Sequence, residues 1–360
     1  MDWETYRRQK AFAGEKKPSM LRRMVGHDYT DRQMYMVTLV TEGRQPLFGQ
    51  VVGRSNGAVG TPEEPRTLLT ALGEAVVDRW MATEQLYPEI EVVALQMMPD
   101  HLHGILFVRK RMEQHLGMVI KGFKTGCNKA YRRLVLGQPA SVPSVATSVP
   151  SVATSVPCVA TRSQQTERRP KDDRRHGLLF ARGYNDKLLL RSGQLDTWLR
   201  YLADNPRRLL MKREQPELFR VQHNLQFGGY TFSAIGNRFL LDRPWKLQVQ
   251  CSRSLTAEAI QAKVEECLAK ARLGAVLVSP AISPGEKAVM RAAFDARLPL
   301  ILLQENGFTD MAKPSGKRME ACGEGRLLIL APWEHRNERI AIKRNQCLSL
   351  NEMALVICQG

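Results

Sequence analysis

Cysteine is sparse in this chain of 360 residues. The seven cysteines are scattered, odd in number and never spaced as C-x-x-C, so neither a disulfide framework nor a zinc ribbon is indicated, and reduced thiols fit best. The sequence also lacks any apolar run of about 18 residues, the length that a membrane-spanning helix needs. Its first residues, Met1–Arg8, contain no apolar signal-peptide core. We therefore expect a cytoplasmic protein with no membrane partner.

Acidic residues are too few to balance the basic ones. The chain has 53 Lys and Arg against 36 Asp and Glu, a formal net charge of +17. This excess favours nucleic acid as the partner, although a role in solubility alone, or binding to anionic lipid, is an alternative on composition. With 43% hydrophobic and 25% charged residues the chain is typical of globular proteins. At about 150 residues per domain, its length predicts about two domains.

One low-complexity segment interrupts the chain. Residues 141–161 read SVPSVAT, SVPSVAT and SVPCVAT, and the proline in each unit excludes a heptad coiled coil. We interpret 137–176, which includes the polar stretch that follows, as a disordered insertion. It lies within an N-terminal domain spanning 28–221, which follows a basic tail at 1–27 and precedes a second domain at 222–360.

Hydrophobic periodicity predicts an α+β layout for the N-terminal domain. We expect an antiparallel or mixed sheet with helices on one side, and a hairpin of 33–40 with 47–52. The other expected strands are 90–97, 101–108 and 178–190, and the expected helices are 67–86, 114–136 and 195–212.

Past residue 222 the chain alternates short apolar runs with helical stretches. The runs, each typical of a buried parallel strand, are 247–250, 275–278, 298–303, 327–330 and 353–357. The helical stretches are 256–272 and 285–296. The pattern predicts a C-terminal α/β domain of Rossmann-like type.

The densest chemical signal is a pair of histidines, His101 and His103, at the start of an expected strand. Alternation along a strand puts both imidazoles on one face, where they can hold one divalent ion with positions left open for substrate. Taken alone, the H-x-H pattern more often marks two surface or hydrogen-bonded histidines.

Three motifs occur in order along the chain. Residues 35–41 read Tyr-Met-Val-Thr-Leu-Val-Thr and precede Leu-Phe-Gly at 47–49, residues 97–104 read Met-Met-Pro-Asp-His-Leu-His-Gly, and residues 201–206 read Tyr-Leu-Ala-Asp-Asn-Pro. The chain thereby resembles the IS200-like single-tyrosine (Y1) HUH transposases, and more closely their REP-associated tyrosine transposase branch. The resemblance covers about 28–215 apart from the insertion, and it implies an HUH, ferredoxin-like palm for the N-terminal domain.

The resemblance implies metal-dependent cleavage and strand transfer of single-stranded DNA. His101, His103 and Asn205 would hold Mg²⁺ or Mn²⁺, and Tyr201 would attack phosphorus to give a 5′-phosphotyrosine and a free 3′-OH. Asn205 follows Tyr201 by four residues, so both side chains lie on one helix face. Members of this branch recognise palindromic hairpins, which makes hairpin DNA the expected partner.

Two other tyrosines, Tyr131 and Tyr184, compete for the role of nucleophile. We favour Tyr201 because its helix supplies both a nucleophile and a ligand. Asp100 departs from the Asn that is usual in the family. It is either a partner for a histidine or the cap of a turn.

Basic residues on the two helices that flank the insertion are expected to bind phosphates. They are Lys121, Lys124, Lys129, Arg132, Arg133, Arg207 and Arg208. A hairpin-binding regulator without cleavage activity is the alternative function, and a replication initiator or relaxase is disfavoured by the motif order. Monomer and homodimer both remain open.

The C-terminal domain weakly resembles the Rossmann-like domain of the DNA-processing protein DprA. Gly285, Gly307, Gly316 and Arg344 are candidate phosphate contacts. No G-x-G-x-x-G or P-loop motif is present, so we assign no ligand there.

Overall fold

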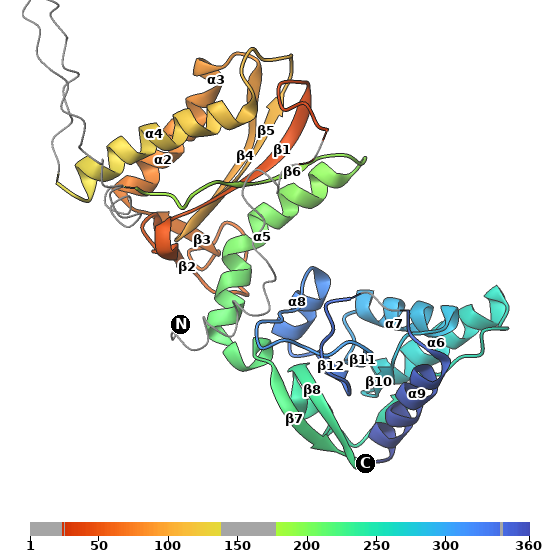
Figure 1. Cartoon of the computed structure of the whole chain (residues 1–360). Helices are drawn as coiled ribbons and strands as arrows, with labels where there is room; N and C mark the ends of the chain where they lie inside the picture. The colour runs from red at the N-terminus through yellow and green to blue at the C-terminus, as the bar shows by residue number, and fades with distance from the viewer. Residues whose placement is uncertain (1–23, 25, 138–177, 339–340) are drawn as a thin grey trace, which may run out of the picture. The chain divides into compact units, whose positions relative to one another are not determined.

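The computed structural model describes residues 24, 26–137, 178–338 and 341–360. The expected tail and insertion therefore lie outside the described residues, except for residues 24, 26, 27 and 137. The chain divides into two compact units, and the division falls inside one long helix, between Pro206 and Arg207. Figure 1 shows the N-terminal unit in red to yellow-green and the C-terminal unit in green to blue.

The N-terminal unit combines an antiparallel sheet with helices, which confirms the α+β expectation. Its strands are β1 (Gln33–Val40), β2 (Gly49–Val52), β3 (Arg66–Leu69), β4 (Ile90–Met98), β5 (His101–Val108) and β6 (Asn185–Leu188). Its helices are α2 (Ala71–Met81), α3 (Thr83–Leu86), α4 (Leu116–Leu134) and the first part of α5 (Gln194–Glu214).

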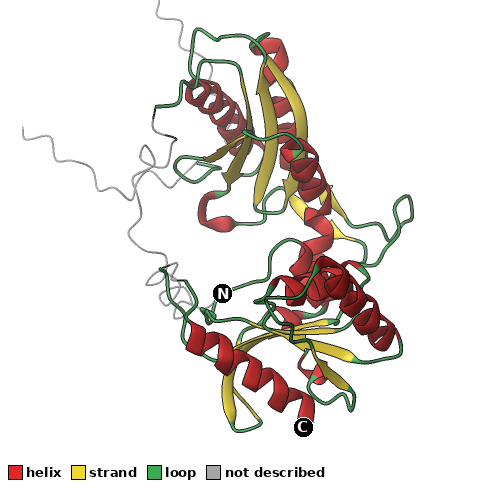
Figure 2. Cartoon of the chain, turned by 90° about the vertical axis from the view of Figure 1, so that its right-hand side faces the viewer, coloured by secondary structure: helices red, strands yellow, loops and turns green. Residues whose placement is uncertain are grey.

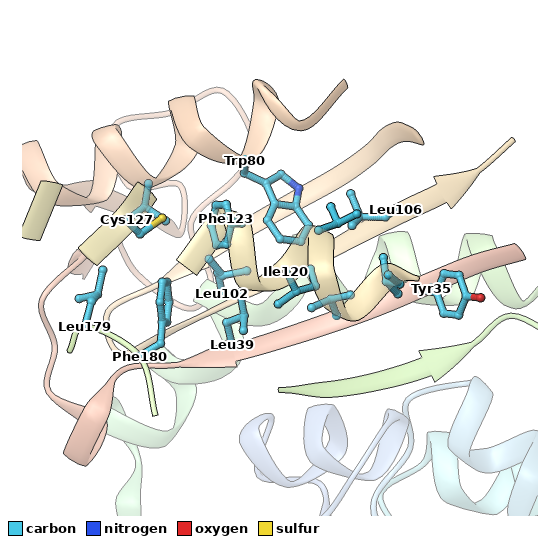
Figure 3. Close-up of a cluster of buried hydrophobic side chains, with 14 of the residues drawn as sticks. Tyr35, Leu39, Trp80, Leu102, Leu106, Ile120, Phe123, Cys127, Leu179 and Phe180 are labelled. Atoms are coloured by element: carbon cyan, nitrogen blue, oxygen red, sulfur yellow. The ribbon is translucent and has the colours of Figure 1, made fainter. Parts of the chain in front are cut away.

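The main sheet has the strand order β4-β5-β1-β6, and all neighbours are antiparallel. One face packs on α2 and α4 around Trp80, Leu102 and Phe123 (Figure 3). On the other face Met36 and Ile105 pack against Trp198 and Leu202 of α5. The expectation that helices cover one side only is therefore wrong, because α5 buries its apolar stripe on the second face.

Three N-terminal expectations need correction. Residues 47–52 do not pair with β1, because β5 and β6 occupy both of its edges, and β2 pairs with β3 instead. The helix expected at 67–86 begins at Ala71, where Thr70 caps it by accepting a hydrogen bond from the Gly73 N–H. Within 178–190 the only strand is β6, preceded by an isolated bridge at Phe180.

The C-terminal unit has a six-stranded mixed sheet in the order β7-β8-β12-β11-β10-β9, in which β9 to β12 are parallel. Its strands are β7 (Gln222–Phe227), β8 (Tyr230–Gly236), β9 (Lys246–Gln248), β10 (Val276–Ser279), β11 (Leu300–Leu303) and β12 (Leu327–Ala331). Its helices are α6 (Ala257–Arg272), α7 (Pro284–Asp295), α8 (Lys317–Gly323) and α9 (Arg344–Gln359).

Helices cover both faces of this sheet (Figure 2). Residues of α6, α7 and α8 form one core, and residues of α9 form the other. The parallel α/β layout confirms the Rossmann-like expectation. Among the described residues, no helix is long and apolar enough to span a membrane.

The expected strand at 353–357 is wrong, because these residues belong to α9. The buried residues Leu350, Met353, Ala354 and Ile357 recur at helical spacing, and a short apolar run alone does not distinguish a buried strand from a buried helix. The hairpin of β7 with β8, which closes one edge of the sheet, was not expected from the sequence.

Candidate active site

The histidine pair opens β5, directly after the turn that joins it to β4. Alternation along β5 puts His101, His103 and Ile105 on the face covered by α5. The two imidazole rings lie edge to face, with centroids 4.9 Å apart. The expectation that they share one face is confirmed.

The His101 ring is held by a charged partner. Its Nδ1 lies 2.5 Å from Oδ1 of Asp100, whose other oxygen accepts a hydrogen bond from Arg44 at 3.1 Å. Burial opposes ionisation of Asp100, but the hydrogen bonds from His101 and Arg44 outweigh it and keep the Asp100 pKa below its ordinary value. A carboxylate only accepts, so Nδ1 of His101 carries a proton and donates it to Asp100, and Nε2 is the ring atom that is left to face a ligand.

The His103 ring is held by a neutral partner. Its Nδ1 lies 2.8 Å from the hydroxyl of Thr38, the residue directly opposite on β1. Burial, followed by the nearby charges of His101, Lys187 and Arg44, lowers the His103 pKa to about 4. The ring is therefore neutral near pH 7, the state in which an imidazole binds a metal ion.

Helix α5 brings the tyrosine to the same face. Trp198 and Leu202 anchor it on the sheet, and the Tyr201 ring packs edge-on against His103 with centroids 5.7 Å apart. Tyr201 is 37% exposed, so part of the residue faces solvent. Asn205, one turn further along, is buried on the side of the helix that carries Tyr201.

A divalent ion has a modest set of donors here. The described residues contain no cluster of three His, Cys, Asp or Glu side chains able to hold a metal. The two imidazoles remain, together with the Asn205 amide, whose buried Nδ2 has no hydrogen-bond partner among the described residues. Since the two amide positions are interchangeable in such an assignment, this unsatisfied amide fits a third ligand. The donor set suits a weakly held ion completed by substrate oxygens.

The rival tyrosines lie elsewhere. Tyr131 of α4 and Tyr184 both pack against the core formed with α2 and α4, on the face of the sheet opposite the histidines. Among these three tyrosines, the geometry brings only Tyr201 to the histidine pair.

The expected DNA-binding residues are spread over different surfaces. Lys121, Lys129, Arg132 and Arg133 are exposed on α4, which covers the face opposite the histidines. Lys124 is half-buried, and its ammonium group donates to the carbonyl oxygens of Ala181 and Gly183. The structure therefore does not bring the α4 cations to the histidine face.

Arg207 and Arg208 belong to the C-terminal unit. Arg207 lies 3.9 Å from Glu320, and Arg208 donates to the carbonyl oxygen of Gly316.

Sequence reasoning missed three residues beside the histidines: Thr38, Arg44 and Lys187. Thr38 stands in the first motif, and its role follows only from strand register. Lys187 on β6 lies opposite Met36, so it points to the α5 face. Arg44 and Lys187 are the cations whose charges act on His103.

Two of the candidate phosphate glycines of the C-terminal unit, Gly285 and Gly307, have packing roles, and Gly316 has a conformational one. A Cβ on Gly285 would lie 2.8 Å from Cys251 Cβ, and one on Gly307 would lie 2.2 Å from the carbonyl oxygen of Trp333. Gly316 has φ of +57° just before α8, a conformation that favours glycine. Arg344 is the first residue of α9.

Comparison with known proteins gives distant similarities. No family model matches the chain. An uncharacterized protein of Haemophilus influenzae is 21% identical over 131 residues, which cover 31% of this chain and 67% of that protein.

Three solved structures are similar in part. A REP-associated tyrosine transposase bound to a REP hairpin is 10% identical, with a TM-score of 0.30, over 51% of this chain and 72% of that one. A candidate transposase of Deinococcus radiodurans R1 is 14% identical, with a TM-score of 0.26, over 51% of this chain and 98% of that one. DNA processing protein A of Helicobacter pylori, described for its single-stranded DNA binding mode, is 18% identical, with a TM-score of 0.29. The similarity covers 39% of this chain and 66% of that one, just under two thirds of its length. No family is assigned from these values.

Proposed function

We propose that this chain is a metal-dependent endonuclease and strand transferase of the tyrosine HUH type, acting on single-stranded DNA with hairpin or palindromic repeats. The observation that carries the proposal is the approach of the Tyr201 ring to within 5.7 Å of His103, itself 4.9 Å from His101. A phenol nucleophile beside two imidazole side chains matches what the order of the three sequence motifs implies.

In the proposed reaction Tyr201 is the nucleophile. Its phenolic oxygen forms a bond to the scissile phosphorus, the phenol proton passes to solvent, and the bond from phosphorus to the 3′-oxygen breaks. The departing 3′-oxygen takes up a proton, which leaves a 5′-phosphotyrosine. A 3′-OH of another strand then attacks the same phosphorus and releases the phenol, so rejoining needs no ATP.

His101, His103 and Asn205 would hold Mg²⁺ or Mn²⁺, which supplies Lewis-acid stabilisation of the charge on the scissile phosphate. Asp100 and Thr38 keep the two imidazoles oriented. Arg44 and Lys187, the nearest cations, would attract the phosphate backbone.

The test is adduct formation. Purified protein is incubated with single-stranded hairpin DNAs drawn from repeats near its own gene, with Mn²⁺ or Mg²⁺, and resolved on a denaturing gel. Wild type is expected to form a denaturant-resistant protein–DNA adduct, and Tyr201→Phe and His103→Ala are expected to lose it. Tyr131→Phe is the matched control and should retain it.

Two outcomes contradict the proposal. An adduct that persists in Tyr201→Phe assigns the nucleophile elsewhere. Tight hairpin binding without an adduct in wild type favours the alternative function, a DNA-binding regulator.

A further inference from the structure

A cavity lies in the C-terminal unit, on the face of the parallel sheet that α7 and α8 cover. Its volume is about 510 Å³. The lining comes from α7, from the start of α8 and Ser315 before it, from β11 and the first residue of β12, and from Ala281 just after β10. The cavity therefore extends from the first residues of β11 and β12 to the loop that follows β10.

The floor of this cavity is apolar. Met290 and Phe294 of α7 contribute to it together with Leu302 of β11, and Leu300 and Leu327 complete it. Phe294 and Leu302 are half-buried, so apolar surface is open to a ligand. Such a surface accepts a planar group such as a nucleobase.

The rim is cationic. Lys287, Arg291, Lys317 and Arg318 line the cavity with a single carboxylate, Asp295. Lys317 pairs with Asp295 at 2.7 Å. No salt bridge joins the other three, which are exposed, to a carboxylate in the described ranges, so they are available to an anionic ligand.

The cationic surface continues beyond the cavity. Arg208 donates to the carbonyl oxygen of Gly316, the residue before Lys317. Burial, followed by the charges of Lys313 and Arg208, lowers the pKa of Lys212, which lies one turn along α5 from Arg208. This run of cations is longer than one phosphate requires, and it therefore favours a chain of phosphates over a small anion.

A cavity at the carboxyl edge of the sheet differs in charge. It has about 590 Å³ and is lined by Asp310 and Glu334 together with His223 and His335. Two carboxylates disfavour phosphate there, so the α7–α8 cavity is the better site for a polyanion.

We propose that the α7–α8 cavity binds one nucleobase of single-stranded DNA on its apolar floor, with the flanking phosphates on Arg291, Arg318 and the neighbouring lysines. This inference rests on the proposed function, because it takes single-stranded DNA as the partner. It gives the C-terminal unit a strand-holding role separate from cleavage.

The test measures the salt dependence of binding by the full chain. Fluorescence anisotropy with a labelled oligothymidylate of about 16 nucleotides is recorded in EDTA, between about 50 and 200 mM salt. The variant Arg291→Gln/Arg318→Gln should lower the slope of log K against log salt by about 1.4, since each lost single-strand phosphate contact contributes about 0.7. The matched control, Arg253→Gln/Arg272→Gln, removes two exposed arginines of the same unit and should leave the slope unchanged.

A second arm tests the floor. An abasic oligomer of the same length should bind wild type about tenfold more weakly than oligothymidylate, and Phe294→Leu should reduce that difference. Circular dichroism verifies that each variant is folded.

Four results overturn the inference. The first two are equal salt slopes for the cavity and control variants, and no binding of the oligonucleotide at all. The third is competition by polyglutamate that displaces the labelled oligonucleotide as well as DNA of equal charge does, and the fourth is saturation of the site by thymidine monophosphate, which would make a free nucleotide the ligand. Because the assay needs no cleavage, a missing covalent adduct would refute the proposed function without changing these slopes.

Discussion

The two units place their functional side chains in different ways. In the N-terminal unit, three side chains of different chemistry, His101, His103 and Tyr201, converge on one face of an antiparallel sheet. In the C-terminal unit, side chains of one kind, lysine and arginine, surround an apolar cavity on a parallel sheet. The proposed cleavage in the N-terminal unit depends on each of its three side chains. The proposed DNA binding in the C-terminal unit is instead shared among several equivalent charges. Single substitutions should therefore abolish function in one unit and weaken it in the other.

The largest effect expected from this comparison is a separation of cleavage from binding. His103→Ala should lower the rate of adduct formation by about 10³-fold or more, because a bound metal ion stabilises transition-state charge by several kcal/mol. Its affinity for DNA in EDTA should stay near that of wild type. Arg291→Gln/Arg318→Gln should show the reverse: weaker binding, with an unchanged single-turnover rate at saturating DNA. Parallel loss of both properties in either variant would break the distinction between the units.

A second prediction compares the packing of the two units at two glycines. A Cβ on Gly104 of β5 would lie 2.0 Å from the fully buried indole of Trp80, whereas one on Gly323 of α8 would lie 2.1 Å from the terminal methyl of Met211. An indole in a core does not move aside, so Gly104→Ala should destabilise its unit by about 3 kcal/mol. Gly323→Ala should stay within about 1 kcal/mol, because a methionine end adapts and alanine favours the helix.

Native-state hydrogen exchange measures the loss of stability at β5 and at α8 separately. That matters because a chain of two units does not unfold in a single two-state step. Similar losses at the two glycines would contradict the contrast in packing.

How far the fold follows from sequence also differs between the units. Alternation identified β4 and β5, and helical spacing identified α4 and α5, because these elements are long and their periodicity is strong. The pairing of β1 was wrong because register with β6, more than 140 residues later, is not visible in local pattern. In the C-terminal unit the run from Met353 to Ile357, expected as a strand, belongs to α9; its apolar residues are adjacent, so local pattern does not separate the two cases.

The candidate site was predictable only in part. His101, His103, Tyr201 and Asn205 stand in motifs, and the sequence order alone singles them out. Thr38 and Lys187 reach the site through cross-strand pairing, which no motif records. The α4 cations are expected to bind phosphates on charge alone, and their helix covers the face of the sheet opposite the histidines.

A third prediction concerns the groups that orient the two imidazoles. Thr38→Val removes the hydroxyl 2.8 Å from His103 Nδ1, and Asp100→Asn removes the charge beside His101. Each should weaken Mn²⁺ binding about tenfold, because outer partners of metal-bound histidines contribute about 10–100-fold to affinity. Titration with Mn²⁺ alone, followed by electron paramagnetic resonance, measures the affinity of each variant for the ion. Thr197→Val, an exposed threonine of α5, is the control, and an equal loss there would assign the effect to packing.

The smallest effect is a difference in pH response. The His103 pKa is lowered to about 4 from an ordinary value of 6.5. Between these two pH values His103 is therefore protonated in the unfolded chain and neutral in the folded chain. Stability of the N-terminal unit from this source is complete above pH 6.5 and is lost as pH falls toward 4.

Between pH 7 and pH 6 the loss should be less than about 1 kcal/mol, and His103→Gln should remove it. The measurement is native-state hydrogen exchange of β1 and β5 in EDTA, corrected for intrinsic exchange rates. Oligonucleotide binding through the α7–α8 cavity should stay constant over the same interval, because arginine side chains remain charged throughout. A binding constant that changes with pH in step with the N-terminal unit would mean that the DNA is held at the histidine face, and that the cationic cavity is not an independent site.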